Sequence, residues 1–145
     1  MVQIHLQDDQ PKATEWVLDS GCTNHMTGDK NLLMSTDLSP SPLKHITYVD
    51  KGKIKVLGLG RVAISKDRHM DKVMLVESLG FNLMSVSMLC DLDMVVVFGK
   101  YRCIVLMESY NSKVFEGFRR GDLYIVDFST GPQPATCLLA KASEG

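Results

Sequence analysis

The chain has 145 residues and a formal net charge of −1; 45% of its residues are hydrophobic and 23% are charged. This composition is typical of one folded domain rather than a disordered segment, and the charge offers no global basic field to attract nucleic acid or an anionic membrane. No stretch approaches the roughly 20 apolar residues that a membrane-spanning helix requires, and the four scattered cysteines favour a reducing, intracellular compartment.

The N-terminal third of the chain has one strand signal between two polar stretches. Residues 1–13 are polar and acidic, which predicts a linker rather than a secretory signal. A short hydrophobic run, 14–18, predicts a strand that ends at Asp19-Ser20-Gly21. Residues 23–42 are rich in Thr, Asn, Ser, Asp, Gly and Pro, and they predict a loop with one apolar anchor at 32–34.

Short β-like runs follow from residue 45 onward. Residues 46–49 and 53–57 flank Asp50-Lys51-Gly52, a spacing that predicts a β-hairpin. Apolar residues at spacings of three predict a short helix over 82–89. Further strands are predicted at 61–65, 72–76, 94–98, 101–107 and 123–126. The sequence therefore predicts a mostly β protein with one short helix.

The tripeptide Asp19-Ser20-Gly21 is the motif that can carry chemistry. A carboxylate at the end of a strand can be presented on a tight turn, and the Ser20 hydroxyl can bind nearby backbone. Gly21 has no Cβ, so another backbone or a substrate can approach it closely. The tripeptide alone is also ordinary turn chemistry, so its surroundings must decide.

Those surroundings resemble the active-site segment of the proteases of copia-type retrotransposons. The resemblance is carried by residues 16–28, Trp-Val-Leu-Asp-Ser-Gly-Cys-Thr-Asn-His-Met-Thr-Gly. Residues 50–62 resemble the flap region of that family, and residues 82–89, Asn-Leu-Met-Ser-Val-Ser-Met-Leu, resemble the apolar segment after the flap. Residues 117–124, Gly-Phe-Arg-Arg-Gly-Asp-Leu-Tyr, resemble the start of the pre-integrase segment.

The resemblance implies a fold and a division of the chain. The fold would be a small closed retropepsin-like (acid protease) barrel with a flap hairpin and one short helix, assembled as a homodimer. Residues 1–13 would be a linker, 14–107 the protease domain, and 108–145 the partly flexible start of the pre-integrase segment. The sequence holds one Asp-Ser-Gly triplet, so a symmetric dimer would pair Asp19 with the partner's Asp19.

The resemblance also implies an activity and roles for individual residues. The chain would be an aspartic endopeptidase without a cofactor, which processes the Gag–Pol polyprotein in cytoplasmic virus-like particles through a dyad of two Asp19 carboxylates. Ser20 and Gly21 would support the active-site loop, while Asp50, Lys51 and Gly52 would form the flap tip over an extended peptide. We expect no membrane contact and no direct nucleic-acid contact by this domain. The segment Leu83-Met84-Ser85 departs from the wider retropepsin pattern, which has glycine at the third position.

Other readings of the same residues stay open. The chain could be a catalytically inactive, protease-like module for dimerisation or binding. Cys22 and His25 have the spacing of half a zinc site, although Cys90 and Cys103 lack compact spacing for the second half. With bound metal and a basic face, that would make a zinc-dependent nucleic-acid-binding module. A Cys22–His25 nucleophilic pair is the chemical alternative; otherwise we expect His25 only to fold the loop.

Overall fold

The computed structural model describes residues 10–38, 45–48 and 52–129. Within them the chain forms β-strands, one 3-10 helix at Lys30–Leu32 and one α-helix, α1 (Val86–Asp91), which confirms the mostly β class. None of the described helices is long and apolar enough to cross a membrane. The described strands are β1 (Glu15–Asp19), β2 (Met26–Thr27), β3 (Ser35–Asp37), β4 (His45–Tyr48), β5 (Gly52–Ser65), β6 (Arg68–Val76), β7 (Asn82–Ser85), β8 (Met94–Phe98), β9 (Arg102–Met107), β10 (Lys113–Arg120) and β11 (Leu123–Asp127).

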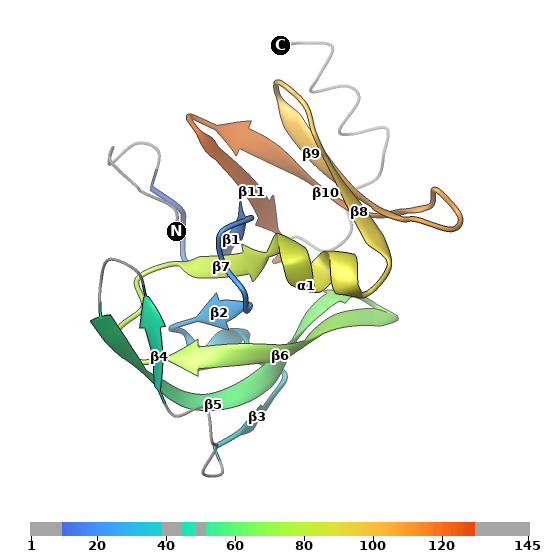
Figure 1. The fold of residues 1–145 in the computed structure, drawn as a ribbon. Helices are drawn as coiled ribbons and strands as arrows, with labels where there is room; N and C mark the ends of the chain where they lie inside the picture. Colours follow the sequence, from blue (N-terminus) through green and yellow to red (C-terminus); the bar gives the residue numbers. More distant parts are fainter. Residues whose placement is uncertain (1–9, 39–44, 49–51, 130–145) are drawn as a thin grey trace.

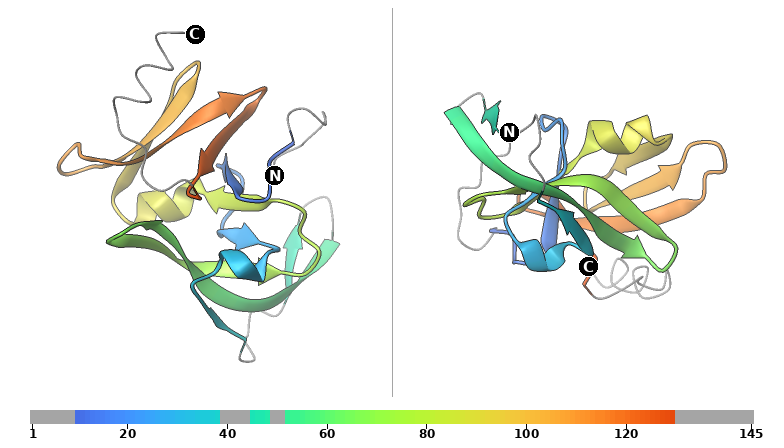
Figure 2. Two further views of the ribbon diagram at one scale, coloured as in Figure 1. Left: turned by 180° about the vertical axis from the view of Figure 1, so that it is seen from behind. Right: turned by 90° about the horizontal axis from the view of Figure 1, so that it is seen from below.

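The strands form one long sheet with β1 and β7 near its middle. Their order is β3-β5-β6-β2-β7-β1-β11-β10-β9-β8, and β4 pairs with β5 beside this path. In Figure 1, β3 to β6 lie on one side of the molecule and β8 to β11 on the other, with β1, β2, β7 and α1 between them. The view from behind in Figure 2 (left) shows the same two groups of strands on opposite sides. The motif-bearing strand β1 is therefore an interior strand of the sheet.

The predicted closure of the barrel is wrong for the described strands. A barrel closes only when its first and last strands pair with each other, yet the described path ends at β3 and at β8. β3 has three largely exposed residues, and it lies at the far end of the molecule from β8 (Figure 1). Val95 and Val97 of β8 are 37% and 46% exposed. β3 pairs only with β5 and β8 only with β9, so among the described strands nothing joins the two ends of the sheet.

The region of β3 and β5 differs from the prediction for a steric reason. β5 is one continuous strand, whereas the sequence predicted two shorter strands at 53–57 and 61–65. A Cβ at Gly58 would lie 2.5 Å from the carbonyl oxygen of Asp37, and one at Gly60 would lie 2.5 Å from that of Ser35. The two glycines therefore let β3 pack against β5. The sequence predicted a loop where β2 and β3 lie, because strands of two or three residues are too short to show an alternation of polar and apolar residues.

The predicted helix at 82–89 is wrong in its first half. Asn82–Ser85 is the strand β7, with all four residues buried, and the helix starts only at Val86. A short buried strand and a short buried helix are both apolar, so spacing alone does not separate them. The Ser85 side chain accepts a hydrogen bond from the N–H of Met88 and so caps α1 where the strand ends.

The hydrophobic core lies on both faces of β1. Trp16 and Leu18 belong to one buried cluster and Val17 belongs to the other. Successive side chains of a strand point to opposite faces, so β1 is clamped from both sides. All five of its residues are buried. This strand is consequently one of the best-supported places in the molecule from which to present a functional side chain.

The sheet continues beyond residue 107 without a break in pairing. β10 pairs with β9, and β11 returns to pair antiparallel with β1, with Trp16 opposite Val126. Arg119 and Arg120 lie in β10, and the turn to β11 comes at Gly121, which has φ 60. The division of the chain at residue 107 stays a prediction, but described strands from both sides of it form one sheet.

Candidate active site

Asp19 is a buried carboxylate at the base of an exposed turn. It is the last residue of β1 and only 6% exposed. Its Oδ1 accepts a hydrogen bond of 2.8 Å from the N–H of Gly21, two residues on, which closes the tight turn through the side chain. Ser20 and Gly21 themselves are exposed. The local geometry thus matches a carboxylate held on a turn, and the catalytic roles of these residues stay predictions.

The end of β7 lies next to this turn. β1 and β7 are parallel, and Asp19 is in register with Ser85. Ser85 is fully buried; its Oγ donates a 2.6 Å hydrogen bond to the carbonyl oxygen of Cys22 and accepts one from the N–H of Met88. The Ser85 hydroxyl therefore connects the loop after Asp19 to the start of α1. This contact gives a reason for serine where the wider retropepsin pattern has glycine.

His25 makes a second connection between the same loop and β7. It is 1% exposed, and its Nδ1 accepts a 2.9 Å hydrogen bond from the N–H of Ser85. The carbonyl oxygen of His25 also accepts from the N–H of Met74 in β6. Burial lowers the pKa of His25 from 6.5 to about 4, so the ring is neutral at neutral pH and Nδ1 is free to accept. His25 is therefore a structural residue of the loop, as the simpler reading expected.

Cys22 is arranged for packing rather than for attack. It is 5% exposed, and its Sγ donates to the carbonyl oxygen of Asn24. Burial, with a smaller contribution from the Asp19 carboxylate, raises the pKa of the Cys22 thiol, which disfavours the nucleophilic thiolate. The Nδ1 of His25 is already engaged by Ser85. Among the described residues, no three His, Cys, Asp or Glu side chains are grouped as metal ligands.

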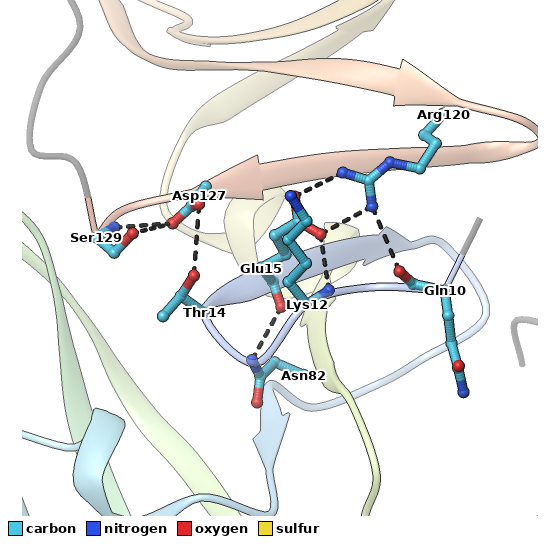
Figure 3. A network of polar contacts seen from close by, with 8 residues as sticks. All are labelled: Gln10, Lys12, Thr14, Glu15, Asn82, Arg120, Asp127 and Ser129. Atoms are coloured by element: carbon cyan, nitrogen blue, oxygen red, sulfur yellow. Dashed lines mark hydrogen bonds and ion pairs between the residues drawn. The ribbon is translucent and has the colours of Figure 1, made fainter. Parts of the chain in front are cut away.

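A network of buried polar side chains aligns β1, β2 and β7 at the end of β1 opposite the turn. Thr27 of β2 donates from Oγ1 to Asn82 Oδ1 at 2.6 Å. Asn82 then donates from Nδ2 to the carbonyl oxygens of Ala13 and Glu15, each at 2.9 Å. Figure 3 shows the bond to Glu15. Asn82 thus links the starts of β1 and β7 to β2. Sequence reasoning did not single out Asn82, because its partners come from distant segments of the chain.

The predicted β-hairpin is confirmed in its two strands, and its role as a flap stays a prediction. β4 pairs antiparallel with β5, with Ile46 opposite Ile54 and Tyr48 opposite Gly52. Gly52 is thus the first residue of β5. Asp50 and Lys51, the predicted tip, lie outside the described residues. Their role over a substrate stays a prediction.

Comparison with known proteins places this β-sheet domain in a family. Residues 16–94, more than half of the chain, match the family "Pol polyprotein, beta-barrel domain". The chain belongs to this family. The matched region contains the Asp19 turn, the hairpin of β4 and β5, β7 and α1. Membership confirms that the chain is a region of a Pol polyprotein.

One curated relative supports the same origin. The chain is 36% identical over 75 residues to a putative transposon Ty5-1 protein of Saccharomyces cerevisiae. The aligned part is 52% of this chain and 49% of the relative, so the chain spans about half the length of that protein. No solved structure matches the chain. The two matches together support a retrotransposon Pol polyprotein as the source of the domain.

Ser85→Ala is expected to destabilise the fold by about 2 kcal/mol. The variant loses the helix cap and leaves the buried Cys22 carbonyl without the Ser85 hydroxyl as donor. Urea unfolding followed by circular dichroism measures the change. Ser87→Ala is the control: it removes an exposed residue's hydroxyl that lies 3.0 Å from Ser85 Oγ but leaves the Ser85 bonds to Cys22 and Met88 in place, so it should cost well under half as much. Equal effects of the two substitutions would contradict the role given to Ser85.

Proposed function

We propose that the chain is the aspartic endopeptidase of a copia-type retrotransposon polyprotein, active as a retropepsin-like homodimer with one Asp19 from each chain. The observation that carries the proposal is the buried Asp19 carboxylate at the end of an interior strand, held by the N–H of Gly21. The family match and the sequence resemblance of residues 16–28 to copia-type proteases support it further.

The chemistry follows from two carboxylates in contact. Two such groups cannot both ionise readily, so the pair shares one proton. The ionised Asp19 takes a proton from a water molecule, which attacks the carbonyl carbon of the peptide bond. The protonated Asp19 of the other chain donates a hydrogen bond to the carbonyl oxygen, and a proton then passes to the leaving amine. This sequence of steps requires no cofactor.

The neighbours of Asp19 are suited to such a dimer. The exposed Ser20 hydroxyl and Gly21 are accessible to the same turn of a second chain, where Ser20 would brace the two loops and Gly21 would allow close approach. His25 and Ser85 would hold each loop in place from within its own chain. Within one chain the single Asp-Ser-Gly triplet supplies half of the required pair.

The substrate in this proposal is the Gag–Pol polyprotein in an extended conformation. An extended peptide can bind as an added strand, with the flap tip at Asp50, Lys51 and Gly52 closing over it. The reaction would take place in cytoplasmic virus-like particles, without membrane or direct nucleic-acid contact by this domain.

The test is cleavage of a fragment of the chain's own Gag–Pol polyprotein between about pH 4 and 8. We expect cleavage that pepstatin blocks, a bell-shaped dependence on pH because the dyad must hold one proton, and a specific activity that falls on dilution. Cleavage that resists pepstatin but stops with a thiol reagent would point to Cys22 instead. No cleavage at concentrations where sedimentation shows a dimer would favour the inactive binding module.

A further inference from the structure

The first residue of β1 is a buried carboxylate that depends on an arginine far away in the sequence. Glu15 is 3% exposed, and its two carboxylate oxygens accept one hydrogen bond each, both of 2.8 Å, from the two terminal nitrogens of Arg120 in β10. The N–H of Lys12 adds a third bond of 2.7 Å to the same carboxylate (Figure 3). The hydrogen bonds from Arg120 lower the pKa of Glu15, against the burial that would raise it. The carboxylate therefore stays ionised inside the protein because Arg120 is there.

This ion pair lies where the strand that carries Asp19 is anchored. The backbone carbonyl of Glu15 accepts from Asn82, so the same residue joins β1 to β7 and to β10. The residue opposite Glu15 in the β1–β11 pairing is Asp127, whose carboxylate accepts a hydrogen bond from the Thr14 hydroxyl. Figure 3 shows these contacts around the start of β1. The residues that anchor β1 on the side away from β7 thus come from residues 113–127.

We propose that Arg120 is a positioning residue of the Asp19 site, and that residues 113–127 belong to the unit that builds this site. Residues 117–124 resemble the start of the next polyprotein segment, yet they supply the cation for Glu15 and lead into the strand beside β1. The positioning role rests on the proposed protease function. It also constrains the substrate: productive processing on the C-terminal side must cut after Asp127. A cut between β9 and β10 that released the later strands would expose the edge of β1 and leave Glu15 without its cation.

Geometry and burial give this pair more weight than a surface salt bridge. Exposed ion pairs contribute little to stability, but breaking a buried pair leaves an uncompensated charge. The side chains of Glu15 and Arg120 are 4% and 22% exposed. The contact is bidentate, which the planar guanidinium provides and the single ammonium group of lysine does not. The adjacent Arg119 donates instead to the carbonyl oxygen of Gly121 and lies over the Tyr124 ring, so it is a matched control.

The experiment compares Arg120→Ala, Arg120→Lys and Arg119→Ala in the full chain. At pH 7 we expect Arg120→Ala to raise the unfolding equilibrium constant roughly 150-fold, the lower end for breaking a buried ion pair, because the Arg120 side chain is partly exposed. It should also lower kcat for a peptide substrate with little change in KM, since Arg120 contacts the start of β1 and Asp19 lies at its end. Arg120→Lys should fall between Arg120→Ala and the original chain. Hydrogen exchange of the β1 and β7 amides should accelerate in Arg120→Ala and stay unchanged in Arg119→Ala.

Two readouts separate positioning through Glu15 from a general packing defect. Adding Glu15→Gln to Arg120→Ala removes the unpaired charge, so the double variant should regain stability and kcat; it also serves if Arg120→Ala alone does not fold. The loss of stability in Arg120→Ala should shrink as the pH falls from 7 toward the lowered pKa of Glu15 in the original chain, because the buried carboxyl without its cation takes up a proton and then no longer needs the cation.

The proposal is overturned if Arg120→Ala matches Arg119→Ala in stability and in kcat. It is also overturned if the loss of stability in Arg120→Ala changes neither with pH nor when Glu15→Gln is added. If stability and exchange respond as expected while the original chain cleaves no peptide under any condition, the coupling of β10 to β1 is supported and the protease function falls. If the original chain and Arg120→Ala cleave with equal kcat, the positioning role falls and the protease function remains.

Discussion

Asp19→Asn is expected to reduce peptide cleavage by roughly 10⁴-fold or more, the largest effect of any single substitution in this chain. Asparagine keeps the shape of the side chain and an oxygen that can accept from the N–H of Gly21, so the turn should stay folded. It cannot take a proton from water, and a pair of two asparagines has no general base. The measurement is kcat/KM on a fluorogenic peptide, with urea unfolding as the check that the fold is intact.

Mixing the two chains tests the shared site more directly. If the active species is a dimer with one Asp19 from each chain, an equimolar mixture contains roughly one quarter original homodimer, one half heterodimer and one quarter variant homodimer. Because the heterodimer lacks one carboxylate, activity should fall to about a quarter of that of the original chain at the same total concentration. Retention of half the activity would mean that each chain acts alone, and the dyad would then be wrong.

The parts of this site that sequence reasoning found are those built from neighbouring residues. Asp19, Ser20 and Gly21 follow a hydrophobic strand directly, so the turn and its carboxylate could be read from a few consecutive residues. The hairpin of β4 and β5 was also found, because its second strand alternates and only three residues separate the two predicted strands. In each case the pattern and the contacts lie within the same short window.

The supporting contacts could not be read in this way because they join distant segments. His25 and Ser85 are 60 residues apart, and Glu15 and Arg120 are 105 apart. A buried serine or glutamate in a sequence is indistinguishable from an exposed one until the partner strand is known. The same limit explains the error over β7, whose four buried residues match a helix as well as a strand until β1 is placed beside them.

The chain is expected to lose stability on acidification between pH 6.5 and about 4, by about 3 kcal/mol through His25 alone. In the unfolded chain, His25 takes up a proton near pH 6.5; in the folded chain, burial keeps it neutral down to about pH 4. Between these values the unfolded state binds more protons, so stability rises with pH across this window and falls as the pH is lowered. Protonation would also remove the Nδ1 acceptor that holds the N–H of Ser85.

His25→Asn isolates this contribution, because asparagine offers an oxygen near the position of Nδ1 and does not titrate. Unfolding free energies measured from pH 4.5 to 7.5 should show a clearly smaller slope for His25→Asn than for the original chain. The depressed pKa of Glu15 moves its own effect below pH 4.5, outside that range. If the dyad works in the mildly acidic range, protonation of His25 helps to set the lowest pH of activity, because His25 holds the loop after Asp19. Identical slopes for the original chain and His25→Asn would show that His25 does not set this limit.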